Sequence, residues 1–182
     1  MLFDTHAHMD DRAFDTDRET LLADLPNQGI ALLMNPGCSL ESSRNVDKLT
    51  RQYDYIYGAV GSHPDVADEV NEFPEVTGVF HCYSGSAEMA KELVKRGWYI
   101  GFTGVLTFKN ARKAIEVASS IPLDRIVLET DCPYMSPEPF RGKRNDPGKL
   151  YRMAEKLAEI KGMTVEEIHA VTVENGKRLY RI

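Results

Sequence analysis

The sequence alternates short apolar runs with amphipathic segments along its whole length, and this alternation limits the fold more than any other feature. The apolar runs carry hydrophobic residues at consecutive positions, as strands buried on both faces do. The intervening segments place apolar residues at helical spacing, as Leu150, Met153 and Leu157 show. Six strands are therefore predicted, over residues 2–7, 30–35, 55–61, 78–82, 98–103 and 125–130.

The order of the predicted elements indicates the fold class. Strands that alternate with helices form a parallel sheet with helical crossovers, which is either a doubly wound open sheet or a (β/α) barrel. No glycine-rich phosphate loop follows the first strand, and this argues against the dinucleotide-binding form of the open sheet. A length of 182 residues suits one domain, so we expect residues 1–182 to form a single domain.

Charge and cysteine content narrow the class of function. The net charge of −6 gives no overall attraction to nucleic acid, so positive charge that binds nucleic acid must be concentrated locally. No apolar run has the length of a membrane span, and the N-terminus lacks the layout of a signal peptide. The three cysteines lack zinc-type spacing and are predicted to be reduced, which indicates a cytoplasmic protein without membrane contact.

Two histidines follow the first predicted strand in the place where a phosphate loop would lie. His6 and His8 are two residues apart, so in an extended chain their side chains point to the same side and can hold one divalent metal ion. Imidazole pairs favour zinc, manganese, iron, cobalt or nickel over magnesium. Asp131 directly follows an apolar run and is predicted to join them, because a buried carboxylate needs a partner. The alternatives are a packed core histidine and a helix-capping aspartate.

Two further histidines end predicted strands, where the catalytic groups of parallel barrels gather. His81 lies in the run VFHCYSGS and is interpreted as a second metal ligand or a phosphate contact, with a structural histidine as the alternative. His63 precedes Pro64, which favours an extended entry, so it is predicted to orient substrate rather than to bind metal. His169 falls within a predicted helix and is interpreted as a surface residue.

A basic cluster follows the last predicted strand, in a proline-rich loop over residues 132–147. Arg141, Lys143 and Arg144 are suited to hold phosphates, and Tyr134 is suited to stack on a base. The alternative is a solvated loop whose charges pair with nearby carboxylates. Because the loop leaves the same strand end as Asp131, both interpretations stay open.

Several of these runs together resemble the TatD family of metal-dependent deoxyribonucleases. The similarity extends over nearly the whole chain, through FDTHAHMDD, GSHP, GVFHCYSGS, WYIGFTGVLTFKNA, RIVLETDCPYMSPEPFRGKRNDP and VTVENGKRLY. The resemblance implies an eight-stranded (β/α) barrel with one or two metal ions that hydrolyses phosphodiester bonds in DNA, often as a 3′ to 5′ exonuclease. It also implies that His6, His8 and Asp131 bind one ion, that His81 binds the second, and that the basic loop faces the DNA substrate.

The chain departs from the family pattern between the GSHP and FHCYSGS motifs. A complete barrel has about 250 residues and eight strands, whereas this chain has 182 residues and six predicted strands. The family has two more strands in this interval, one ending in the glutamate that bridges the two metals and the other in a histidine of the second metal site. Only residues 65–77 fill that space, so the predicted fold is a TIM-type barrel shortened by two β/α units.

The cause of this loss stays open among three explanations: a deletion, a stretch of the natural protein that this sequence lacks, or two shortened chains that complete one another. A true six-stranded chain exposes two sheet edges, so a homo-oligomer is expected in that case. Three functions are compared. They are a metal-dependent deoxyribonuclease with Asp131 as ligand and base, a hydrolase of small amides or esters, and a relative that binds metal or DNA without turnover. The basic loop favours the first, and the lost glutamate favours the third.

Overall fold

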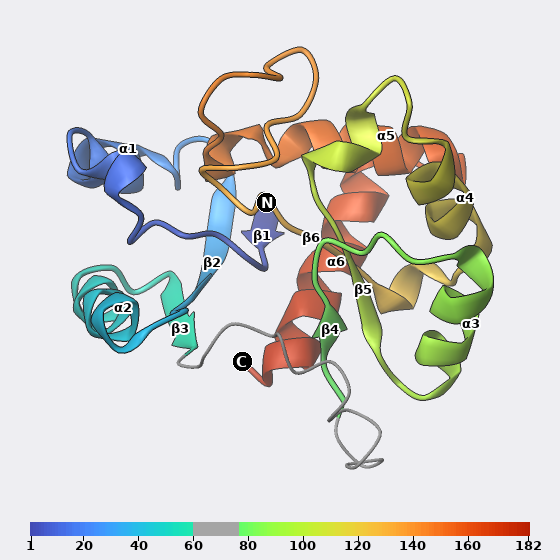
Figure 1. Ribbon diagram of the computed structural model, residues 1–182, viewed down its shortest axis with the longest axis horizontal. Coiled ribbons are helices and arrows are strands. Elements are labelled where there is room, and N and C mark those ends of the chain that lie inside the picture. The colour runs from blue at the N-terminus through green and yellow to red at the C-terminus, as the bar shows by residue number, and fades with distance from the viewer. Residues whose placement is uncertain (60–76) are drawn as a thin grey trace.

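The computed structural model describes residues 1–59 and 77–182, and within them strands alternate with helices as the sequence predicts (Figure 1). The strands are β1 (Leu2–Asp4), β2 (Ile30–Pro36), β3 (Ile56–Ala59), β4 (Val79–Phe80), β5 (Tyr99–Phe102) and β6 (Ile126–Leu128). The α-helices are α1 (Arg18–Asp24), α2 (Leu40–Gln52), α3 (Ala87–Lys95), α4 (Arg112–Ser120), α5 (Tyr151–Lys161) and α6 (Val165–Tyr180). The 3-10 turns are η1 (Arg12–Phe14), η3 (Gly104–Thr107), η4 (Leu123–Arg125) and η5 (Pro147–Lys149).

The strands form two parallel sheets of three, in the orders β1-β2-β3 and β4-β5-β6. The two sheets meet where β6 runs beside β1, because the Thr5 amide donates a hydrogen bond to the Leu128 carbonyl at 3.2 Å. The order around the ring is therefore β4-β5-β6-β1-β2-β3, and within the described residues β3 and β4 are its two ends. This is a parallel barrel interrupted between β3 and β4, where the sequence predicted the loss.

Helices cover the outside of the ring. In Figure 1, α1 and α2 lie on one side with β2 and β3, whereas α3, α4 and α5 lie on the other side with β5. The longest helix, α6, packs against β1 and β6 and covers the junction between the two sheets. Leu33, Ile100, Ile126 and Leu128 are buried in the core between these layers. Within the described residues, no helix combines the length and apolar character that crossing a membrane requires.

Side-chain caps begin several helices where the sequence contains a serine or threonine. Ser39 accepts a hydrogen bond from the Ser42 amide at the start of α2, and Ser86 accepts one from the Met89 amide at the start of α3. Thr164 forms a capping box with Glu167. The helix that begins at this box, α6, has 16 residues and packs against β1 and β6.

Four strands, β1, β4, β5 and β6, are shorter than predicted, whereas β2 extends one residue further. The early end of β1 changes how the histidine pair is held. The first strand was expected over residues 2–7, but β1 ends at Asp4. Beyond Asp4 the extended chain runs between two neighbours, because the Ala7 amide donates to the Met34 carbonyl at 3.0 Å and the His8 amide to the Cys132 carbonyl at 2.9 Å. The histidines thus lie on a loop that is fixed from both sides rather than on the strand itself.

Candidate metal centre

His6 and His8 face each other at the carboxyl end of β1. Their Nε2 atoms lie 3.2 Å apart, and their rings meet edge to face with centroids 4.9 Å apart. Both side chains are partly buried, with 18% and 21% of their surfaces exposed. The two nitrogens therefore converge on one small volume that stays open to solvent.

Asp131 brings a carboxylate to the same place from the carboxyl end of β6. Its Oδ1 lies 3.9 Å from Nε2 of His6 and 3.6 Å from Nε2 of His8. The Asp131 backbone has a φ of 54°, in the left-handed region that non-glycine residues other than Asn and Asp seldom adopt. Its amide donates a hydrogen bond to the His6 carbonyl at 2.8 Å, which fixes the carboxylate relative to the histidines.

His81 completes the group from the loop after β4. Its Nε2 lies 3.4 Å from Oδ1 of Asp131, and its ring stacks on that of His6 with centroids 3.6 Å apart. The ligand atoms of His6, His81 and Asp131 all lie within 4.8 Å of one another. The structure thus brings together all four residues that the sequence proposed as metal ligands.

This donor set fits a divalent metal ion. Ligand atoms that share one ion at about 2.1 Å lie about 3–3.5 Å apart in tetrahedral geometry. The 3.2 Å separation of the His6 and His8 nitrogens falls in that range, and their separations from Asp131 Oδ1 are slightly longer. Imidazole and carboxylate together suit zinc, manganese or a similar transition metal.

The surroundings of the cluster shift the pKa values of two histidines in opposite directions. Burial, together with the nearby His81 and His8, lowers the pKa of His6 to about 2. Burial also acts to lower the pKa of His81, but hydrogen bonds and charge from Asp131 and Glu129 outweigh it and raise the pKa to about 10. Positive charge is therefore stabilised at the point where the carboxylates converge.

Two buried carboxylates beside the ligands were not identified from the sequence. Asp4, at the end of β1, accepts hydrogen bonds from the Thr130 amide at 2.9 Å and the Thr130 hydroxyl at 2.5 Å, and burial raises its pKa to about 7. Glu129 is completely buried and contacts the ring of His81. The signal was present, because a charged residue inside an apolar strand run requires a partner.

The three basic residues of the loop over residues 132–147 differ in their contacts. Arg144 forms an ion pair with Asp17 and donates to the Ala13 carbonyl at 2.8 Å, so it fastens the loop to the N-terminal region. The Arg141 guanidinium lies over the Phe108 ring, 4.3 Å from its centroid. Lys143 is exposed.

Tyr134, His63 and His169 are the other residues for which the sequence predicted a role or a position. Tyr134 is 57% exposed, and its hydroxyl donates to the Asp11 carboxylate at 3.2 Å. His63 lies outside the described residues. His169, expected at the surface of a helix, lies in α6 but is only partly exposed, since its Nε2 is buried.

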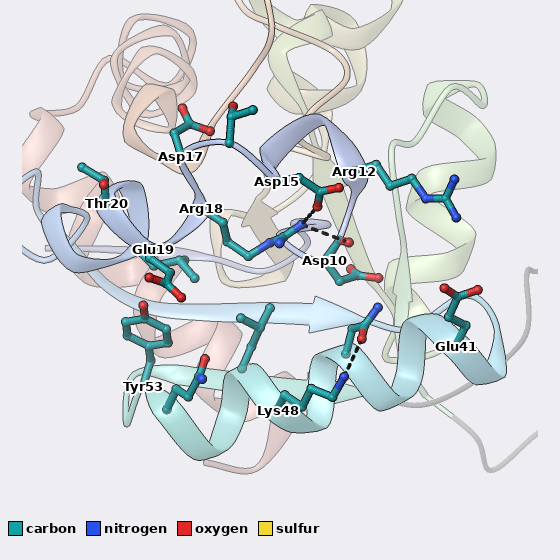
Figure 2. A pocket seen from close by; sticks show the side chains of 15 residues that line it. Asp10, Arg12, Asp15, Asp17, Arg18, Glu19, Thr20, Glu41, Lys48 and Tyr53 are labelled. Atoms are coloured by element: carbon teal, nitrogen blue, oxygen red, sulfur yellow. Dashed lines mark hydrogen bonds and ion pairs between the residues drawn. The ribbon is translucent and has the colours of Figure 1, made fainter.

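A separate cleft of about 530 Å³ lies between α1 and α2 (Figure 2). Its lining carries charges of both signs, and several of them are already paired. Arg18 forms an ion pair with Asp15 at 2.7 Å, and Asp10 accepts hydrogen bonds from Asn35 and Ser42. None of the candidate metal ligands lines this cleft, so it is distinct from the histidine cluster.

A shortened parallel β/α barrel with histidines and an aspartate converging at its strand ends defines a metal-dependent hydrolase of the TIM-barrel class. The family model described as TatD related DNase matches residues 3–76 and, separately, residues 70–181. Together these matches include nearly the entire chain, which therefore belongs to the TatD family.

Curated relatives agree with this assignment. The chain is 34% identical to the uncharacterized metal-dependent hydrolase YabD of Bacillus subtilis (strain 168) over 254 residues, an alignment that covers 100% of both proteins. It is 45% identical to the uncharacterized metal-dependent hydrolase YcfH of Escherichia coli (strain K12) over 105 residues, which is 58% of this chain and 40% of that protein. These relatives confirm a metal-dependent hydrolase.

Solved structures confirm the fold. The crystal structure of YjjV, a TatD homologue from Escherichia coli K12, superimposes with a TM-score of 0.87 at 22% identity and covers 100% of this chain and 98% of that one. A TatD family hydrolase from Entamoeba histolytica gives a TM-score of 0.82 at 15% identity, covering 98% and 97% of the two chains.

The comparisons also confirm that the chain is shortened internally. The alignment with the Bacillus relative spans 254 residues, whereas this chain has 182, so many of its positions have no residue here. The family model matches in two segments that overlap at residues 70–76, within the interval where the resemblance predicts the loss.

Proposed function

We propose that this chain hydrolyses phosphodiester bonds in DNA, as a 3′ to 5′ exonuclease, at a divalent metal centre held by His6, His8 and Asp131. The observation that carries the proposal is the convergence of these three side chains, with ligand atoms 3.2–3.9 Å apart, at the carboxyl ends of two adjacent strands. His81 supplies a further nitrogen on the same side and is assigned to a second ion.

Each residue has a definite task in this proposal. A divalent ion held by these residues would supply Lewis-acid polarisation of the phosphate and would lower the pKa of a nearby water molecule. Asp131 is assigned to take the proton of the attacking water, because its Oδ1 lies 3.4–3.9 Å from the Nε2 atoms of all three histidines. His6 remains neutral and available as a ligand, since its pKa is held far below its ordinary value.

Two exposed basic side chains support DNA as the substrate. Arg141 and Lys143 are exposed on the loop that follows Asp131, and neither forms an ion pair among the described residues. They are therefore free to contact phosphates, whereas Arg144 is already bound to Asp17. A small neutral substrate has no phosphate group for these two side chains to bind.

The test is hydrolysis of end-labelled single-stranded DNA with added Mn²⁺ or Mg²⁺, with and without a chelator. We expect shortening from the 3′ end that the chelator abolishes. Asp131→Asn, which suits the left-handed backbone, and His6→Ala are both expected to lower the rate by at least about 100-fold. His169→Ala is the matched control, because this histidine lies in α6 outside the cluster. Activity unchanged in the first two variants contradicts the proposal.

A metal titration and an ester-hydrolysis assay, run beside the DNA assay, distinguish the two alternative functions. A chain that binds Zn²⁺ or Mn²⁺ in a titration but leaves every DNA substrate intact has kept metal binding without turnover. A chain that hydrolyses a neutral ester equally well after the double change Arg141→Ala and Lys143→Ala acts on small substrates. For the deoxyribonuclease, this double variant is expected to weaken DNA binding and to reduce its dependence on salt concentration.

A further inference from the structure

Glu129 is the residue that follows β6, two positions before Asp131, and it is completely buried. Its amide donates to the Phe102 carbonyl at 3.2 Å, so its backbone still pairs with β5. A carboxylate in this position loses its hydration and requires charged or hydrogen-bonding partners within the protein. The contacts of Glu129 therefore indicate why a charged residue is kept here.

Both partners of the Glu129 carboxylate come from the loop that carries the candidate ligand His81. Its Oε1 accepts a hydrogen bond from the Cys82 amide at 2.6 Å, and the same oxygen lies 3.0 Å from Nδ1 of His81. The carboxylate thus accepts a hydrogen bond from the backbone of the loop and lies against the ring of the histidine.

Each of the two facing side chains also has one buried polar atom without a hydrogen-bond partner. Within the described residues, His81 Nδ1 and Glu129 Oε2 are both buried without a hydrogen bond of good geometry. Because Nδ1 lies within 3.0 Å of the carboxylate, a small rotation of either side chain pairs them. The two side chains are therefore placed to form a linear hydrogen bond from Nδ1 to the carboxylate.

The neighbouring strand makes room for this carboxylate. A Cβ atom built on Gly101 in β5 would lie 2.5 Å from Oε1 of Glu129. The carboxylate thus lies directly over a position without a side chain, and any larger residue there displaces it. The glycine and the buried acid form one arrangement together with the histidine.

We propose that Glu129 is the positioning residue for His81, fixing its ring so that Nδ1 carries the proton and Nε2 is presented to the metal. This inference rests on the proposed metal centre and assigns a role to a residue outside the ligand set. Metal-binding histidines commonly donate their other ring N–H to a carboxylate, which orients the ring and strengthens the ligand.

The test measures Zn²⁺ binding by calorimetric titration of the full chain, without any substrate. Glu129→Gln preserves the size of the side chain and removes its charge, and it is expected to weaken Zn²⁺ binding by about 10- to 100-fold. Glu155→Gln is the matched control, because this glutamate forms only an exposed ion pair with Arg152 on α5. Gly101→Ala is a second variant that displaces the carboxylate from outside, and it is expected to weaken binding in the same direction.

A double-mutant cycle separates positioning from a general structural role. If Glu129 acts through His81, adding Glu129→Gln to His81→Ala produces no further loss of Zn²⁺ affinity. In ¹⁵N NMR spectra of the zinc-loaded protein, the His81 ring is expected to carry its proton on Nδ1, and Glu129→Gln is expected to mix the two tautomers.

The outcomes that overturn the inference differ from those that overturn the metal centre. Failure of the unmodified chain to bind Zn²⁺ contradicts the metal centre itself. Tight binding by the unmodified chain, combined with equal affinity in Glu129→Gln, contradicts only the positioning role. An equal loss from Glu129→Gln in the presence and absence of His81 also overturns it, because the carboxylate would then act on the site by another route.

Discussion

The two sides of the shortened barrel differ in how completely their strands are joined. On the β6–β1 side, hydrogen bonds connect the strands and the loops beyond them, from Thr5 and Leu128 to Asp131 and His6. Every residue of β1 and of β6 is buried, and α6 covers the junction from outside. We call this side the seam.

On the opposite side lie β3 and β4. In β3, Ile56 is buried but Gly58 is exposed, and both residues of the short β4 are only partly buried. Among the described residues, neither strand has a neighbour on its outer edge. We call this side the open side.

The contrast shows which part of the site survives the loss of strands. His6, His8 and Asp131 extend from the two strands of the seam, so their geometry does not depend on the open side. The resemblance to the TatD family predicts that a bridging glutamate and a further histidine follow strands between β3 and β4. We therefore expect the ligands of the seam to remain in place while those two are lost.

The largest effect is expected at the open side, where unpaired edges favour association. We expect light scattering to give twice the monomer mass, and dilution to lower both the mass and the melting temperature. Such edges are poorly compatible with an isolated folded chain. A monomer that melts in one cooperative transition contradicts this expectation and implies that the open side is covered within one chain.

At the seam, the largest effect is expected from Asp4→Ala. This change removes the acceptor of both hydrogen bonds from Thr130 and leaves a buried amide without a partner. We expect a loss of about 3 kcal/mol in the free energy of unfolding, measured by urea denaturation. Asp47→Ala removes an exposed carboxylate of α2 that pairs with Arg51, and it is expected to cost less than about 0.5 kcal/mol. Equal losses of stability in the two variants would show that the Asp4 hydrogen bonds of the seam contribute no more than an exposed ion pair.

Asn175→Ala is expected to produce a smaller loss at the outer face of the seam. Its side-chain amide donates to the Leu123 carbonyl at 2.8 Å and to the Ile126 carbonyl at 2.7 Å, which attaches α6 to β6. Removing both donors is expected to cost about 2 kcal/mol in thermal or urea unfolding. Asn27→Ala serves as the control, since Asn27 is exposed and bonds only to Asp24. If Asn175→Ala loses no more stability than Asn27→Ala, the attachment of α6 to β6 does not stabilise the seam.

The smallest effect compares two tyrosine hydroxyls, each of which donates to a backbone carbonyl. Tyr180 donates to Thr5 at 2.8 Å at the seam, and Tyr55 donates to Leu22 at 2.7 Å beside β3. Burial raises the pKa of both hydroxyls, so both are neutral donors at neutral pH. We expect Tyr180→Phe to cost about 1 kcal/mol and Tyr55→Phe to cost less. The reverse order in melting experiments would place the more rigid region on the open side.

The ligand set could be predicted because its signals are local. His6 and His8 are two residues apart in an extended segment, and Asp131 directly follows an apolar run. Parallel strands then bring their carboxyl ends to one edge of the barrel, so strand order alone places these residues together. The β/α fold followed from the same alternation, whereas its shortening was predicted only from the resemblance to the TatD family, whose motifs flank the missing interval.

Other features depend on contacts between distant segments, which periodicity does not encode. Glu129 contacts His81 across 48 positions of the numbering, and Arg144 pairs with Asp17 across 127 positions. The basic cluster read as one unit in the sequence, yet the fold assigns Arg144 to an ion pair and leaves Lys143 exposed. The exact strand ends were also unpredictable, because loop hydrogen bonds on both sides fix the segment beyond β1.

The left-handed backbone at Asp131 has a consequence for how this lineage can change. At a φ of 54°, glycine, asparagine and aspartate fit most readily, and other residues carry a conformational cost of roughly 1–2 kcal/mol. The backbone therefore restricts this position even in a descendant that no longer hydrolyses anything. Replacement of Asp131 by asparagine or glycine is therefore expected to remove the carboxylate while preserving the local backbone.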